Sequence, residues 1–199
     1  LQGNSPFQVV WLPDEVRETW LARVSVFAER RASLREPIVF EGNAPASVRD
    51  NALLRASLHG KSIQPGATPR IWLGAPNSIK GPTEAIFRRQ SGNHLLIVGQ
   101  REEAALGMLG VALIALAAQH PKSSAQFFVF DCSAPDSAEA KFLEHAVRAV
   151  PHEIKLVRAG DVEDVMAALA AEEQQRTDDP GAVTPETYLL IHCLQRNKK

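Results

Sequence analysis

The residues best placed to do chemistry lie in one short segment, where an apolar run ends at Gly99 and an Ala/Leu-rich run begins at Ala104. A strand, a tight turn and a helix in this order form a framework that binds phosphate. The phosphate-binding motif G-x-x-x-x-G-K-[ST] can start at Gly99, and its last three positions are then Ala104, Ala105 and Leu106. The spacing predicts the framework of a phosphate site without its reactive side chains.

The motif needs one side chain that binds phosphate and another that binds magnesium, and this sequence has neither. Its lysine neutralises the β- and γ-phosphates and its hydroxyl binds Mg²⁺, which alanine and leucine cannot do. Gln100 and Arg101 are followed by Glu102 and Glu103, whose carboxylates would repel a triphosphate. Acidic residues do stabilise the first turn of a helix. Two hypotheses stay open: the carboxylates occupy the anion site themselves, or they only stabilise the start of the helix.

Three further residues end apolar runs and could belong to the same site. His192 and Cys193 follow the last run, where they could form a nucleophile pair or bind a metal. Adjacent strand residues point to opposite faces, which favours the simpler interpretation of a histidine that ends a strand. Asp131 could lie near a magnesium site, or it could cap the loop or helix that follows. We therefore predict no catalytic residue and no metal ligand.

The elements that would position these residues alternate between strands and helices, which is typical of a parallel α/β sheet. The central strand of this sheet is expected at 94–98, directly before Gly99. The other predicted strands are 7–12, 70–74, 125–131, 153–157 and 188–191, and the predicted helices are 14–31, 48–58, 104–118, 138–150 and 161–175. A connector rich in glycine and proline divides the chain into an N-terminal appendage, residues 1–60, and a core domain, residues 61–199.

The composition restricts the possible functions. A net charge of −1 over 199 residues gives no basic surface for nucleic-acid binding. Cys132 and Cys193 lack metal-ligand spacing, which favours two buried, reduced thiols and a cytoplasmic location. No apolar run reaches the length of a membrane span. Because the first residue is leucine, we expect the chain to be a piece of a longer protein.

The order of these pieces resembles the motor domain of FtsK/SpoIIIE-type ATPases over about 130 residues. Leu73 and Gly74 are followed twenty residues later by His-Leu-Leu-Ile-Val-Gly at 94–99. The run 127–131 ends in an aspartate, Val-Pro-His at 150–152 precedes a strand, and a Glu-rich helix ends in Arg176. The run 188–191 then corresponds to the Walker B strand of the family.

The resemblance implies a three-layer RecA/P-loop-like α/β fold that stops after the Walker B strand, so that the chain is incomplete at its C-terminus. It places the Walker A lysine and serine at Ala105 and Leu106, and the Walker B aspartate and glutamate at His192 and Cys193. Active members bind ATP and Mg²⁺, whereas four lost groups on two strands imply a member that neither hydrolyses ATP nor carries a cofactor. Similar degenerate copies occur in EccC-type ATPases of type VII secretion.

The resemblance makes the chain a regulatory or scaffolding domain of a larger DNA- or protein-translocating motor. Its partners would be other ATPase domains of the same parent chain or further copies of itself, with DNA or a secreted protein as the cargo of the full motor. Other parts of the parent could associate with a membrane. Two alternatives remain: an active ATP-hydrolysing translocase module with an atypical P-loop, and a module whose vacant nucleotide pocket binds a partner peptide.

Overall fold

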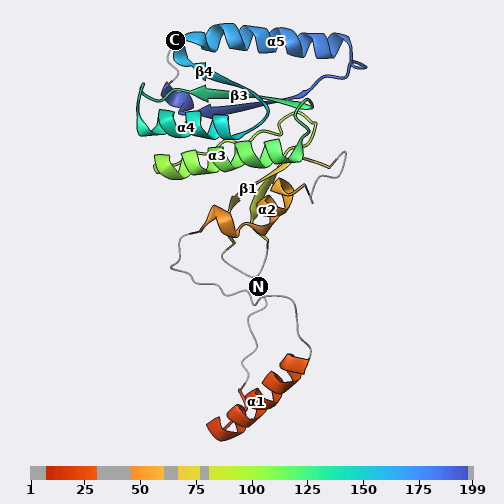
Figure 1. The fold of residues 1–199 in the computed structure, drawn as a ribbon, viewed down its shortest axis with the longest axis vertical. Coiled ribbons are helices and arrows are strands. Elements are labelled where there is room, and N and C mark those ends of the chain that lie inside the picture. The colour runs from red at the N-terminus through yellow and green to blue at the C-terminus, as the bar shows by residue number, and fades with distance from the viewer. Residues whose placement is uncertain (1–7, 31–45, 61–66, 77–80, 197–199) are drawn as a thin grey trace. The chain divides into compact units, whose positions relative to one another are not determined.

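The computed structural model describes residues 8–30, 46–60, 67–76 and 81–196 (Figure 1). The chain forms two compact units, Leu1–Glu41 and Gly42–Lys199. The second unit includes the 3₁₀ helix η1 (Val48–Asp50) and the helix α2 (Ala52–Leu58), which Asn51 separates. The sequence predicts one helix over 48–58 and assigns it to the appendage, whereas in the structure α2 contacts the core helix of the second unit.

The first unit contains the helix α1 (Asp14–Arg30), close to the predicted range of 14–31. Pro13 precedes the helix and its carbonyl accepts the N–H of Arg17 at 2.9 Å, as expected of a proline at a helix start. The predicted strand at 7–12 is wrong over its described part, because residues 8–13 have no regular structure. A lone strand has no partner for its backbone groups, and this unit offers none among its described residues.

The second unit is built on a parallel sheet of three strands in the order β4-β3-β5. These strands are β3 (Ala125–Asp131), β4 (Glu153–Arg158) and β5 (Glu186–His192), and Asp131 pairs in register with both Arg158 and His192. The helix α5 (Val162–Asp178), after the 3₁₀ turn η2 (Ala159–Asp161), covers one face, and α4 (Ala138–Ala149) covers the other (Figure 1). The predicted α/β class is therefore confirmed.

The central strand β3 supplies side chains to both faces of the sheet. Phe127 and Val129 belong to the larger core, which includes residues of α3 and α4. Phe130 packs on the opposite face with Val157 and with Val165 of α5. Burial on both faces explains why this strand reads as a continuous apolar run.

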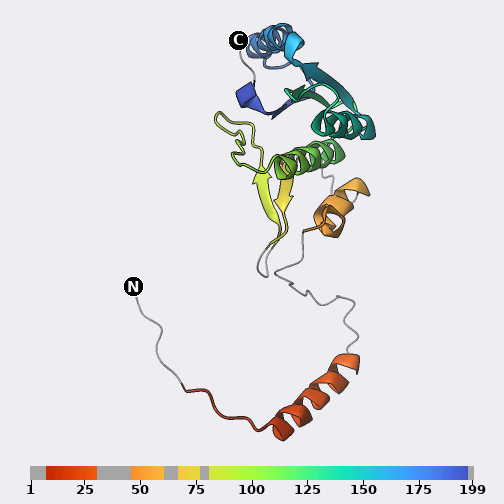
Figure 2. The ribbon, with the colours of Figure 1, turned by 90° about the vertical axis from the view of Figure 1, so that its left-hand side faces the viewer.

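The helix α3 (Glu102–Gln119) lies beside α4 and separates the parallel sheet from a second, two-stranded sheet (Figure 2). That sheet pairs β1 (Arg70–Gly74) with β2 (Thr83–Ile86) in antiparallel fashion. The Gln119 side chain bonds both backbone groups of Arg70, accepting its N–H at 3.1 Å and donating to its carbonyl at 2.7 Å. The end of α3 is thereby fixed to the start of β1.

The predicted central strand at 94–98 is wrong. Residues 93–99 have no regular structure, and Leu96 and Val98 are 76% and 86% exposed. Both edges of β3 are already paired, with β4 and β5, so β3 is the central strand of the described sheet. An apolar run indicates a tendency to be buried but does not specify a strand partner. β5 is consequently an edge strand, and Leu189 and Ile191 are partly exposed.

Among the described residues, α3 alone is long and apolar enough to cross a membrane by length and composition. It has seven buried residues, which face β1, the parallel sheet and the neighbouring helices. A core helix of this kind passes the same test as a membrane span. The sequence-based prediction that no apolar run reaches the length of a membrane span rests on the shorter run at 108–118, whereas α3 extends over Glu102–Gln119.

Candidate functional site

Three potential ligand side chains meet where α3 begins and β5 ends. Glu102 is the first residue of α3, His192 is the last residue of β5, and Cys193 follows it. The Cys193 Sγ lies 3.5 Å from Glu102 Oε1 and 3.4 Å from His192 Nε2. The His192 Nε2 lies 3.9 Å from the same Glu102 oxygen. One carboxylate oxygen, one imidazole nitrogen and one thiol sulfur thus form a small triangle.

The backbone conformation at Cys193 brings its side chain beside that of His192. Cys193 has a φ of +55°, in the left-handed region that residues other than glycine rarely adopt. It lies outside the strand and opens the turn to the 3₁₀ helix η3 (Leu194–Arg196). The prediction that His192 and Cys193 point to opposite faces is therefore wrong, because strand alternation ends at His192.

His192 is held by a hydrogen bond on the far side of its ring. Its side chain is 4% exposed, and its Nδ1 lies 3.1 Å from Ser133 Oγ. Within the described part of the chain, the contacts of its Nε2 are the Cys193 thiol and the Glu102 carboxylate. When Nδ1 carries the proton and donates it to Ser133, the Nε2 lone pair points into the triangle.

Asp131 supports this region from the end of β3. Its Oδ1 accepts the N–H of Ser133 at 2.9 Å, so Asp131 caps the loop that carries the partner of His192. Its Oδ2 forms an ion pair with Arg158 of β4. Arg158 also contacts Glu144 of α4 at 2.6 Å. Of the two interpretations of Asp131, the cap is confirmed.

The electrostatic environment keeps both thiols of this region protonated. Burial raises the pKa of Cys193, and its hydrogen bond to Glu102 raises it further. Burial also raises the pKa of Cys132, as does the negative charge of Asp131. A nucleophilic cysteine needs the opposite shift, toward the thiolate. The Cys193–His192 pair therefore does not have the electrostatics of a nucleophile.

The remaining residues of the predicted loop form no phosphate cradle. Gly99 and Gln100 belong to the irregular segment, and Arg101 is the N-cap of α3 without a capping side-chain bond. Leu106 is buried in the core, so the motif position for a magnesium-binding hydroxyl points away from solvent. The helix start borders an open depression that is lined by Ala46 and by residues 101–104. Ala105 does not line it.

Glu102, His192 and Cys193 were predicted from the sequence as site residues, whereas Ser133 and Arg196 were not. A serine two residues after the predicted strand-end Asp131 was the available signal for Ser133.

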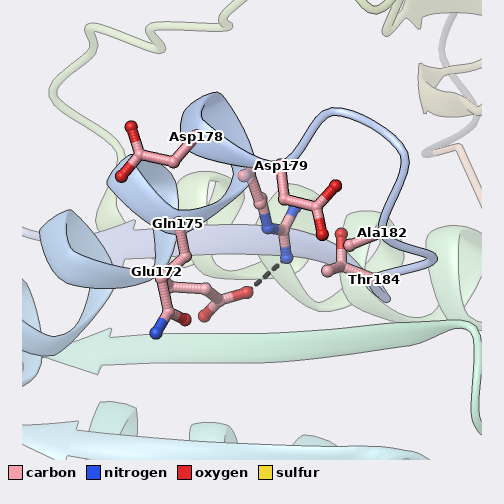
Figure 3. A pocket seen from close by; sticks show the side chains of 7 residues that line it. Glu172, Gln175, Asp178, Asp179, Ala182 and Thr184 are labelled. Carbon is pink, nitrogen blue, oxygen red and sulfur yellow. Dashed lines mark hydrogen bonds and ion pairs between the residues drawn. The ribbon is translucent and has the colours of Figure 1, made fainter.

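A second pocket lies at the other end of the strands, near the start of β5, where Glu172, Gln175, Asp178, Asp179, Ala182 and Thr184 surround the end of α5 (Figure 3). Arg176 forms an ion pair with Glu172 and donates to the Pro185 carbonyl at 2.7 Å and to Thr187 Oγ1 at 2.8 Å. Gln126 of β3 donates to Glu172 at 2.9 Å. The Glu-rich, Arg-terminated end of this helix thus fixes α5 to the starts of β3 and β5.

Comparisons of the chain with protein-family models, with curated proteins and with solved structures found no match.

Proposed function

We propose that the chain is a non-hydrolysing, FtsK/SpoIIIE-like ATPase domain that serves as a regulatory or scaffolding module of a larger translocating motor. The observation that carries the proposal is the position of Glu102. Its carboxylate lies at the start of α3, beside the carboxyl end of a parallel strand. The helix start is where a phosphate would bind in an active relative, because free N–H groups and the helix dipole attract anions.

Two further features support the absence of hydrolysis. Arg196 Nη2 lies 3.5 Å from Glu102 Oε1, so a cation near the helix start is already paired with an internal carboxylate. The irregular segment before Gly99 offers no strand end from which backbone N–H groups could curl around a phosphate. The order of the pieces at 127–131, 150–157, 161–176 and 188–191 supports the family, whereas the strand at 94–98 that would precede its phosphate loop does not form. The geometry around Glu102 supports the lost activity.

Titration calorimetry with MgATP tests the catalytic half of the proposal. We expect no saturable heat with the chain as it stands and no phosphate release above that of buffer. The lost lysine alone removes charge-assisted bonds that contribute roughly 1.5–3 kcal/mol each. The proposal would be contradicted by micromolar binding of MgATP. It would also be contradicted by an ATPase activity that co-purifies with the protein.

The scaffolding half is tested in the motor assembly itself. Sedimentation velocity compares the assembly with and without the unit Gly42–Lys199. We expect removal of this unit to dissociate the assembly while the ATP turnover of each intact active domain is retained. An assembly that keeps its mass without the unit would refute a scaffolding role.

A further inference from the structure

We propose that Glu102, His192 and Cys193 form a binding site for a divalent zinc ion. This inference does not depend on the proposed function, because it concerns the donor atoms alone. Their side chains come from the start of α3 and the end of β5, 91 residues apart in the sequence. The sequence places His192 beside Cys193, which could bind a metal, but contains no signal that brings Glu102 to them.

The distances between the donor atoms match tetrahedral coordination. Zinc binds nitrogen and oxygen at about 2.0 Å and sulfur at about 2.3 Å, so its tetrahedral ligands lie roughly 3.3–3.6 Å apart. The observed separations are 3.4 Å for Cys193–His192, 3.5 Å for Cys193–Glu102 and 3.9 Å for His192–Glu102. The longest of these involves Glu102, whose partly exposed side chain can adjust.

The donor types favour zinc among the common divalent ions. One thiolate and one imidazole are too soft for Mg²⁺ or Ca²⁺, which prefer sets of oxygen ligands. The carboxylate and the thiolate together neutralise the two charges of the metal. Binding releases the thiol proton, since a coordinating cysteine is deprotonated by the metal itself. Three protein ligands leave a fourth coordination position for water.

Ser133 supplies the support that metal-binding histidines usually have. His192 Nδ1 lies 3.1 Å from Ser133 Oγ, which can accept its proton, and in that tautomer Nε2 is free to bind the metal. Without a metal, the hydrogen-bond partner of the buried Nε2 atom is the Cys193 thiol. Ser133 is therefore a positioning residue of the site and does not touch the metal.

Among the described residues, Arg196 is the cation in contact with this triangle, and its charge opposes metal binding. Its Nη2 lies 3.5 Å from the Glu102 oxygen, but half of its side chain is exposed and can turn away into solvent. Removing this charge by Arg196→Gln should tighten metal binding severalfold. If the Arg196–Glu102 ion pair served only to hold Glu102 in place, Arg196→Gln would weaken metal binding instead of tightening it.

Cobalt substitution provides the test, since tetrahedral Co²⁺ with a thiolate ligand gives visible d–d bands and a near-ultraviolet charge-transfer band. The full chain, kept reduced, is titrated with Co²⁺ and then with Zn²⁺, which should displace the cobalt at one ion per chain. We expect Cys193→Ser to abolish the charge-transfer band and Cys132→Ser, the matched control at the neighbouring strand end, to retain it.

Carboxylate variants test the third ligand without disturbing the core. Glu102→Gln should weaken Zn²⁺ binding at least tenfold, and Glu103→Gln, its exposed neighbour in the same helix turn, should leave the affinity unchanged. Ser133→Ala should weaken binding by about 10-fold or more, as loss of a supporting hydrogen bond does elsewhere. The proposal is overturned if the chain gives no charge-transfer band, if the band survives Cys193→Ser, or if both cysteine variants lose it. Equal affinities of the two glutamate variants would also overturn it.

Discussion

At the scale of single residues, the buried carboxylate of Asp131 depends most on one partner. Its side chain is 0% exposed and pairs with Arg158, whose side chain is 39% exposed. Arg158→Met should lower the free energy of unfolding by about 3 kcal/mol, the lower end of the range for breaking a buried pair, because the arginine is partly solvated. Urea unfolding followed by circular dichroism measures this loss.

Arg148→Met provides the matched control for that measurement. Arg148 also reaches Glu144, at 3.4 Å, but its side chain is 74% exposed. An exposed pair of this kind contributes well under about 1 kcal/mol. Equal losses in the two variants would mean that Asp131 does not need its cation.

The same residue illustrates what the sequence can and cannot predict. An acid at the end of an apolar run identified Asp131 as the end of a buried strand. Its partner could not be found, because Arg158 lies on another strand and is brought beside it by the parallel register of β3 and β4. Likewise, Glu102, His192 and Cys193 were each selected as candidates. Their convergence depends on how α3 docks against β5, and the sequence contains no signal for that docking.

At the scale of elements, the packing of α3 against α4 depends on a glycine. A Cβ atom at Gly110 would lie 3.0 Å from the Phe142 ring of α4, whereas one at Gly107 would meet no atom within 4 Å. Replacing a helical glycine by alanine stabilises a helix by about 1 kcal/mol. Gly107→Ala should show this gain in thermal unfolding, and Gly110→Ala should show little of it because Phe142 must shift. Equal gains at both positions would contradict close packing of the two helices.

The helices and strands themselves differ in how far the sequence predicts them. The ranges 125–131, 138–150 and 153–157 were predicted almost to the residue, because each apolar pattern agrees with its tertiary environment. The run 94–98 has an equally strong apolar pattern and yet forms no strand. Pairing is a property of two segments, so a pattern within one of them cannot establish it.

At the scale of the whole molecule, a polar cluster connects α3, the parallel sheet and the segment that follows β2. Glu186 accepts hydrogen bonds from Arg89 at 2.6 Å and from the Tyr188 hydroxyl at 2.8 Å. The Tyr188 hydroxyl also lies 2.9 Å from His120 Nε2 at the end of α3. His152 reaches the His120 carbonyl at 2.9 Å. The protonation of this cluster therefore affects contacts between several elements of the unit at once.

Acidification should destabilise the folded chain through His120. Burial lowers the pKa of His120 below its ordinary value of 6.5, and the positive charges of His152 and Arg89 add to this against the opposing effect of Glu186. The unfolded chain then binds more protons than the folded chain as the pH falls below that value, so the free energy of unfolding decreases. One proton limits the slope to about 1.4 kcal/mol per pH unit.

Urea unfolding at several pH values between about 7.5 and 5 measures this effect, and His120→Gln isolates it. The glutamine side chain keeps a hydrogen-bond donor toward Tyr188 but does not titrate in this range. The stability of the variant should therefore fall less steeply with decreasing pH than that of the unsubstituted chain. The same exchange at His145, an exposed residue of α4, controls for the loss of an imidazole as such. If the free energy of unfolding of His120→Gln depends on pH as steeply as that of the unsubstituted chain, another group is responsible for the acid sensitivity.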